Sequence, residues 1–165
     1  MNKEKIVRQA RRIQEDSLYS EKAHFAMATF WGSLHWILGI PSAVLSATAG
    51  LTILEGQTTV AAVCAALATV LTTLLTFLDP KKSAKDRHEA GVQFNTLWND
   101  IGRFIELDFS EDAIPDNARQ RIGEFAERKA KLIGASPHTG GLPYWLARIS
   151  IDRRQHIHEV DRKPE

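Results

Sequence analysis

Hydrophobic and polar positions are distributed unevenly along this chain. From residue 30 to residue 78 the only Asp, Glu, Lys or Arg is Glu55, although charged residues make up 25% of the whole sequence. A helix that crosses a bilayer needs about 20 mostly apolar residues, and residues 34–54 and 58–78 each supply one such run. Glu55-Gly56-Gln57 predicts a tight polar turn between them, and Asp79-Pro80-Lys81-Lys82 predicts the end of the second helix.

A helical hairpin buried inside a small soluble bundle is the alternative to two membrane spans. A helix in so small a bundle must present a charged face to water, and neither apolar run has one. The pattern therefore favours a transmembrane hairpin with spans at 34–54 and 58–78. A signal peptide is not expected, because a long charged segment precedes the apolar run.

The segments on either side of the hairpin are charged and have helical periodicity. Residues 3–29 predict an amphipathic helix that continues into the first span, and further helices are predicted up to about Asp108, after Pro115 or Asp116, and near 143–158. The expected apolar faces contain, in chain order, Ile6, Ala10, Ile13, Ser17 and Leu18; Ala90, Phe94, Leu97, Trp98, Ile101 and Ile105; Ile122, Phe125, Leu132 and Ile133; and Tyr144, Trp145 and Ile149.

The predicted fold is therefore all-α: a two-helix transmembrane hairpin with N-terminal and C-terminal cytoplasmic helices. Residues 1–165 are expected to form a single domain, divided into 1–30, 31–78 and 79–165. Ten basic residues flank the spans and the turn has none, so the positive-inside rule places both termini in the cytoplasm. The flanking residues are Lys3, Lys5, Arg8, Arg11, Arg12, Lys22, Lys81, Lys82, Lys85 and Arg87.

Composition and motifs narrow the function classes. A net charge of +1 gives no support for nucleic-acid binding, and the single cysteine, Cys64, excludes an intramolecular disulfide or a CxxC site. The phosphate-loop, dinucleotide, zinc-protease and nucleophile-elbow patterns are all absent, so no enzyme activity, cofactor or metal site is predicted. The glycine-containing loop 138–141 and the pair His156 and His158 are weaker signals of phosphate or metal binding than of a turn and a charged terminus.

The second span has two unlike faces. Its small and hydroxylated residues fall within about 100° of one another, opposite the large apolar residues; they are Thr58, Ala62, Ala65, Thr69, Thr72, Thr73 and Thr76. The first span has a small-residue stripe of Gly32, Gly39, Ala43, Ser46 and Gly50. Such faces either pack helices closely or line a wet lumen, and a lumen requires an oligomer because two helices cannot enclose water. His35 within the first span and Glu55 at the pore mouth complete the candidates.

The helix after the second span supplies the candidate oligomer interface. Its residues Phe94, Leu97, Trp98 and Ile101 give more apolar surface than one short helix pair is expected to cover. The cytoplasmic helices are therefore predicted to hold a homo-oligomer together.

Three features resemble the SLATT family, two-transmembrane effector domains that associate with second-messenger nucleotidyltransferases and SLOG sensor domains. They are a charged helix leading into "LGIPSAVLSATAG", a span ending "LTFLDPKKSA", and the helix "RHEAGVQFNTLWNDI". The resemblance covers nearly the whole chain, most firmly residues 20–108. It implies a bacterial inner-membrane effector that opens pores when phage infection is sensed.

The expected function is thus a membrane effector that oligomerises and permeabilises the bacterial inner membrane in anti-phage abortive defence. The trigger implied by the resemblance is a nucleotide second messenger or a partner sensor encoded nearby; no self-contained nucleotide pocket is predicted. The alternative is a membrane-anchored adaptor whose cytoplasmic helices recruit a partner without a pore. The expected partners are a second copy of the chain and membrane lipid.

Overall fold

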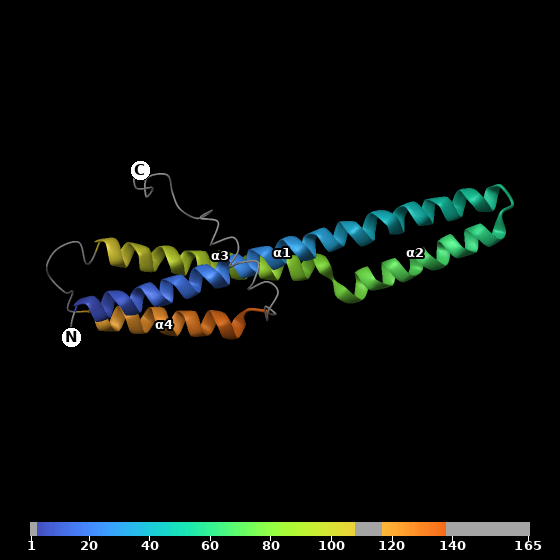
Figure 1. Cartoon of the computed structure of the whole chain (residues 1–165). Helices are drawn as coiled ribbons and strands as arrows, with labels where there is room; N and C mark the ends of the chain where they lie inside the picture. Colours follow the sequence, from blue (N-terminus) through green and yellow to red (C-terminus); the bar gives the residue numbers. More distant parts are fainter. Residues whose placement is uncertain (1–2, 108–116, 138–165) are drawn as a thin grey trace, which may run out of the picture. The chain divides into compact units, whose positions relative to one another are not determined.

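The computed structural model describes residues 3–107 and 117–137, which form four α-helices (Figure 1). The helices are α1 (Lys3–Leu54), α2 (Thr58–Leu78), α3 (Pro80–Leu107) and α4 (Ala118–Ala135). No strand occurs in these two ranges, so the all-α prediction is confirmed for them. The predicted helix near 143–158 with Tyr144, Trp145 and Ile149, the loop 138–141, and His156 and His158 lie outside the described residues.

The N-terminal amphipathic segment and the first apolar run form one helix, as predicted. α1 is 52 residues long and continues through Pro41. α2 has 21 residues, which at about 1.5 Å per residue is close to the roughly 30 Å of a bilayer's hydrocarbon core. Both helices contain segments long and apolar enough to cross a membrane.

Two short junctions set the ends of α2. In the turn before it, Gly56 has a φ of 78°, a left-handed conformation that glycine adopts without strain. After it, Asp79 has a φ of 37° and its backbone N–H donates to the Leu75 carbonyl, which closes the helix. The Asp79 carboxylate then accepts a hydrogen bond from the backbone N–H of Lys82 at 3.2 Å. Asp79 therefore caps α2 and begins α3, and Pro80 occupies the first helical position, where its missing N–H costs nothing.

The described residues divide into two compact units. The first, here called the three-helix unit, comprises residues 3–27 of α1, residues 86–107 of α3, and α4. The second, here called the apolar unit, comprises residues 28–85, with the rest of α1, α2 and the start of α3.

The three-helix unit has an ordinary hydrophobic core. It is formed by Ile6, Ala10 and Ile13 of α1, Leu97, Ile101 and Phe104 of α3, and Ala118, Ile122 and Phe125 of α4. The predicted apolar faces of α1 and α3 are confirmed, but Phe104 was not part of the predicted α3 face. Ile133 was predicted to face the core and is 55% exposed, because the side of α4 that packs inward runs through Ile122, Phe125 and Leu132.

Ion pairs also hold α4 in the three-helix unit. Lys129 pairs with Asp16 of α1, and Arg128 pairs with Asp100 of α3 at 2.8 Å. Solvent-exposed pairs contribute about 0–1 kcal/mol each, whereas full burial of one large apolar side chain contributes about 1.5–3 kcal/mol. The position of α4 therefore depends mainly on the burial of Ile122 and Phe125, and the ion pairs make a smaller contribution.

α1 and α3 approach each other closely where α3 has glycine. A Cβ atom at Gly91 would lie 2.8 Å from Cε1 of Phe25, and one at Gly102 would lie 2.9 Å from Nε2 of Gln14. No real Cβ atom tolerates such a distance, so both positions require glycine unless a neighbour moves. These glycines let the two helices pack at short range on either side of Phe94.

The apolar unit has the opposite distribution of side chains. Its buried residues are small, namely Ala28, Ser42, Ala49, Ala61 and Ala68, together with Pro80. Many of its large apolar residues, such as Ile37, Leu51 and Val63, are more than half exposed. In this unit the helix backbones pack together through small side chains, and many of the large apolar side chains point outward.

Gly91→Ala and Gly123→Ala should shift stability in opposite directions. Gly123 lies on an exposed part of α4, and a Cβ there would meet nothing within 4 Å, so alanine should stabilise by about 0.5–1 kcal/mol through helix propensity. At Gly91 the same gain is outweighed by displacement of the Phe25 ring, since overpacking costs about 1–3 kcal/mol. Thermal denaturation in detergent measures both. Equal melting temperatures for the two variants would show that Phe25 moves aside without cost.

Candidate functional site

The two helices of the apolar unit meet along small residues spaced seven apart. Ser42 and Ala49 of α1 and Ala61 and Ala68 of α2 are all buried. The Ser42 hydroxyl lies 2.7 Å from the Thr72 hydroxyl and donates to the Ala68 carbonyl at 3.3 Å. This seam is the close helix contact that small residues permit, and the Ser42 side chain joins the two helices through its hydrogen bonds to Thr72 and to the Ala68 carbonyl.

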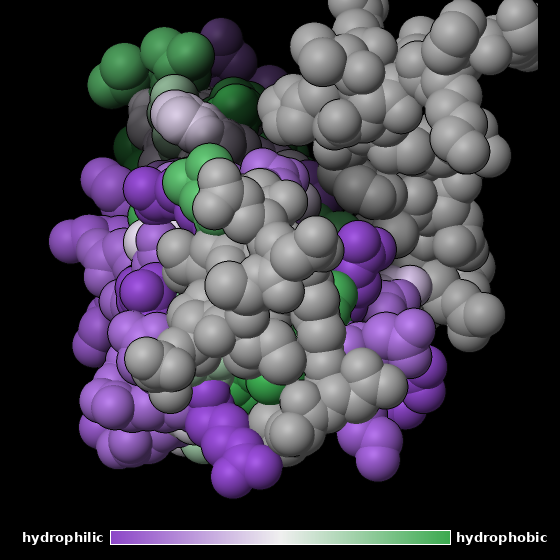
Figure 2. Space-filling view, turned by 90° about the vertical axis from the view of Figure 1, so that its left-hand side faces the viewer, coloured by the Kyte–Doolittle hydropathy of each residue, from purple (hydrophilic) through white to green (hydrophobic). Residues whose placement is uncertain are grey.

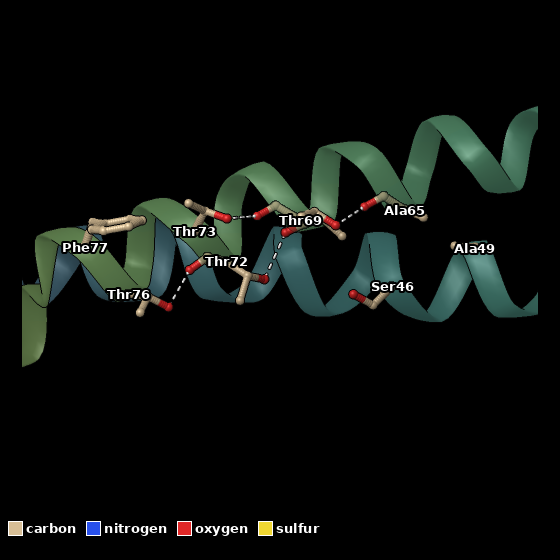
Figure 3. Close-up of a pocket in the computed structure, with 9 residues that line it drawn as sticks. Ser46, Ala49, Ala65, Thr69, Thr72, Thr73, Thr76 and Phe77 are labelled. Atoms are coloured by element: carbon tan, nitrogen blue, oxygen red, sulfur yellow. Dashed lines mark hydrogen bonds between the residues drawn. The ribbon is translucent and has the colours of Figure 1, made fainter.

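The threonine face of α2 borders this seam and faces outward from it. Thr69, Thr73 and Thr76 are exposed, and together with α1 they form an open groove of about 490 Å³ (Figure 3). The groove is lined by Ser46 and Ala49 of α1 and by Ala65, Ala68, Thr69, Thr72, Thr73, Thr76 and Phe77 of α2.

The threonine hydroxyls donate their hydrogens within α2. Thr69 donates to the Ala65 carbonyl at 2.8 Å and Thr73 to the Thr69 carbonyl at 2.7 Å, as the dashed lines in Figure 3 mark. Thr76 donates to the Thr72 carbonyl at 2.9 Å. A hydroxyl has one donor and two acceptor sites, so these side chains satisfy their donors at low cost and direct oxygen toward the groove.

The structure thus gathers four predicted threonines with Ser46, and it leaves the other candidates apart from them. Thr58 is exposed in the first turn of α2, Gly50 is exposed with open space around it, and Glu55 is exposed in the turn. A Cβ at Gly39 would contact the Leu75 side chain at 3.9 Å, so Gly39 faces α2. His35 is half-buried beside Trp36, with ring centroids 5.6 Å apart.

Ser42 is the residue that the sequence analysis missed. The predicted stripe on the first span ran through Ala43 and Gly50, both of which are exposed, whereas the contact with α2 runs one position earlier through Ser42 and Ala49. The seven-residue spacing of Ser42 and Ala49, matched by Ala61 and Ala68, is the signal that identifies the seam.

Most of the candidate oligomer interface on α3 is buried within one chain. Phe94 is 1% exposed, and Leu97 and Ile101 are fully buried, because α1 and α4 cover them within one chain. Trp98 is half-buried, and its carbonyl accepts a long hydrogen bond of 3.5 Å from Gln14 of α1. Phe94, Leu97 and Ile101 therefore stabilise the three-helix unit itself, whereas Trp98 keeps part of its surface exposed.

The three-helix unit buries two ionisable side chains close to each other on α1. Glu21 and His24 are each 4% exposed, and neither Oε2 of Glu21 nor Nδ1 of His24 has a hydrogen-bond partner among the described residues. The His24 ring stacks on Phe94 with centroids 5.5 Å apart. Burial, and then the nearby positive charge of Arg87, lower the pKa of His24 below 6.5.

This pair does not form a metal site in the described part of the chain. No group of three or more His, Cys, Asp or Glu side chains that could hold a metal ion occurs there.

Searches of family models, curated proteins and solved structures found no match to this chain. The site's function must therefore be inferred from its own geometry and from the sequence.

Acidification should destabilise the three-helix unit through His24. Because its pKa in the folded chain is lowered, the unfolded chain takes up the proton first as the pH falls through about 6.5. The stability that neutral His24 contributes is therefore present above that pH and is lost as the pH falls toward the folded pKa. Between pH 7 and pH 5, His24→Gln should lose less stability than the parent protein.

His88→Gln is the matched control for this measurement. His88 is exposed on α3, so its replacement should leave the pH dependence of the parent protein unchanged. Denaturation in detergent at several pH values provides the comparison. The same pH dependence in the parent and in both variants would mean that His24 does not control acid stability.

Proposed function

We propose that this chain is a membrane effector that oligomerises and permeabilises the bacterial inner membrane. In this proposal α2 and the second half of α1 cross the bilayer as a hairpin. One observation on the apolar unit supports the membrane location. Only 11% of the most apolar 18-residue window is buried in either candidate span, whereas the core helix of a soluble protein is mostly buried. Large exposed apolar surfaces on soluble proteins are rare, but lipid covers them without cost.

The outward threonine face is the observation that carries the permeation proposal. Packing of α1 against α2 uses alanines, Ser42 and Thr72, so it does not account for the exposed Thr69, Thr73 and Thr76. In lipid a hydroxylated face is directed toward other helices or water rather than toward acyl chains. Several copies of the groove, turned toward a common axis, would line a pathway whose wall carries hydroxyl oxygens.

The anti-phage role rests on the resemblance to the SLATT family and not on the geometry. That resemblance supports a nucleotide second messenger or a partner sensor as the trigger. The main rival is a membrane-anchored adaptor, in which the same hairpin only holds the three-helix unit at the membrane. Flux of ions or dye through membranes separates the two functions.

Valine at Thr69, Thr73 and Thr76 should abolish leakage from liposomes and toxicity on overexpression. Valine nearly preserves the shape of threonine and removes the hydroxyl, so a hydroxyl-lined pathway should dewet and close. Thr72 is left unchanged because it bonds to Ser42 of α1. If the face only packs helices, the loss of one interhelical hydrogen bond should cost about 0.6 kcal/mol on average. That cost would lower the association constant of the helices by a factor of about three and would leave leakage largely intact.

Leu67→Val with Leu74→Val is the control for the valine variant. Both side chains are exposed on the opposite side of α2, so leakage should persist. Expression and oligomer size must match the parent protein in both variants. Free leakage by the threonine variant would exclude a pathway along this groove, and absence of leakage from the parent protein would favour the adaptor.

The turn between the spans should be accessible only from outside the cell. Replacing Cys64 with alanine removes the only cysteine, after which Gln57→Cys marks the turn and Ser136→Cys marks the end of α4. A membrane-impermeant maleimide added to intact spheroplasts should label position 57 and not position 136, because ten basic residues flank the spans and none lies in the turn. Labelling of position 136 before lysis would reverse the topology.

A further inference from the structure

The outward face of α3 lacks charge in an otherwise highly charged unit. Residues 90–99 contain no Asp, Glu, Lys, Arg or His. On the side of α3 opposite its buried residues lie Val92, Asn95, Thr96 and Asn99, here called the α3 face. Val92 is 46% exposed, Thr96 and Asn99 are exposed, and Asn95 is half-buried.

The other helices of the three-helix unit present charge to solvent. The described outward residues of α1 include Lys5, Arg8, Arg11, Arg12, Glu15 and Asp16, and those of α4 include Arg119, Glu124, Glu127, Arg128 and Lys131. Figure 2 views the end of the molecule where α1 begins and shows hydrophilic residues over most of the surface that is not grey. The centre of a protein interface is depleted of charge and surrounded by a polar rim. The α3 face has this composition, with His88 and Glu89 one turn before it and Arg103 one turn after it.

The side chains of the α3 face are held in place by their own helix. The Thr96 hydroxyl donates to the Val92 carbonyl at 2.9 Å. The Asn99 amide nitrogen lies 3.0 Å from both the backbone carbonyl and the side-chain oxygen of Asn95. The face is therefore ordered before any partner binds, which reduces the entropy lost on association.

We propose that two copies of this chain pair through the α3 face about a two-fold axis. This inference rests on the proposed membrane location, because insertion with one topology places the three-helix units of all copies on the same side of the bilayer. In a two-fold pair, a residue that contacts a second residue of the partner is contacted by that same residue in return. The Asn99 amide hydrogens and the Thr96 hydroxyl hydrogen are already bonded within α3. The Asn95 amide nitrogen can still donate, and the Asn99 side-chain oxygen and the Thr96 hydroxyl oxygen can still accept, so the face can bond to a second copy of itself, whereas a face of one charge cannot.

A second copy fits this face better than a charged partner does. A partner with Lys or Glu at the contact would lose the hydration of those charges without gaining an opposite charge here. Four side chains bury less than the about 1,000 Å² that a stable interface in solution needs. Pairing should therefore depend on confinement to the membrane, which raises the effective concentration of one copy near another.

Cysteine cross-linking in native membranes tests this pairing directly. In a Cys64→Ala background, Asn99→Cys should give a disulfide-linked product of twice the chain's 18.5 kDa on mild oxidation. Glu124→Cys on α4 and Arg11→Cys on α1 are exposed controls and should remain monomeric. Equal cross-linking at all three positions, or a product of Asn99→Cys with a different mass, would overturn the proposal.

Exchange of charge provides a second test that does not depend on disulfide formation. Asn95→Lys with Asn99→Lys should lower the dimer fraction about tenfold or more, because like charges facing each other across an interface are strongly unfavourable. Asn95→Glu with Asn99→Glu should act in the same way. Coexpression of the lysine and glutamate chains should restore pairing between them. Failure of restoration, with both chains folded and inserted, would overturn the proposal.

The outcomes separate this inference from the proposed function. Cross-linking by Asn99→Cys, together with free leakage by the variant with valine at Thr69, Thr73 and Thr76, would support the α3 pairing and exclude a pathway along the groove. If the parent protein leaks and the threonine variant does not, but the lysine variant forms dimers normally, the pathway stands and the α3 pairing falls.

Discussion

Removal of large apolar side chains from water is the constraint on which this structure depends, and the two units meet it in opposite ways. In the three-helix unit, Phe94, Leu97, Ile101 and Phe104 are nearly inaccessible, as the hydrophobic effect requires of a domain in water. In the apolar unit the inaccessible residues are alanines, Ser42 and Pro80. Fifteen of the eighteen large hydrophobic residues that are exposed in the described part of the chain belong to this unit. A bilayer around the apolar unit, as proposed above, would make both arrangements favourable at once.

Polar groups in the apolar unit follow from the same constraint. Hydrocarbon offers no hydrogen bonds, so every donor must find an acceptor within the protein. The threonine hydroxyls do so on carbonyls one turn earlier, and Ser42 does so across the seam. A threonine that bonds within its own helix needs no neighbour for its stability. The exposed threonine face is therefore compatible with the hairpin but is not required by it, and this makes it a candidate for function.

Much of the fold follows from local pattern alone. The apolar runs begin or end at Leu54, Thr58 and Leu78, and these residues are also helix ends. The composition changes at these positions, and the turn-forming residues Gly56 and Pro80 lie next to them. The apolar face of α1 was also predictable, since Ile6, Ala10 and Ile13 have helical spacing. The phase of the seam was not, because glycine, alanine and serine are all small and their order does not show which of them contact α2. The partner that covers the apolar side of α3 was not predictable for a related reason: periodicity shows that Leu97 is buried, but not whether its own chain or a second copy buries it.

The boundaries between the two units do not coincide with loops. One boundary falls between Met27 and Ala28, and the other between Lys85 and Asp86, so both lie inside helices α1 and α3. The change from a water-soluble to a lipid-facing pattern thus takes place without a loop. A loop absorbs displacement through its many backbone conformations, whereas a helix transmits it as rotation or translation of the whole element. α1 does not carry the threonines itself; it meets α2 at the hydrogen bond between Ser42 and Thr72. Between α3 and the helix that carries the threonines lies Asp79, whose left-handed backbone breaks the helix.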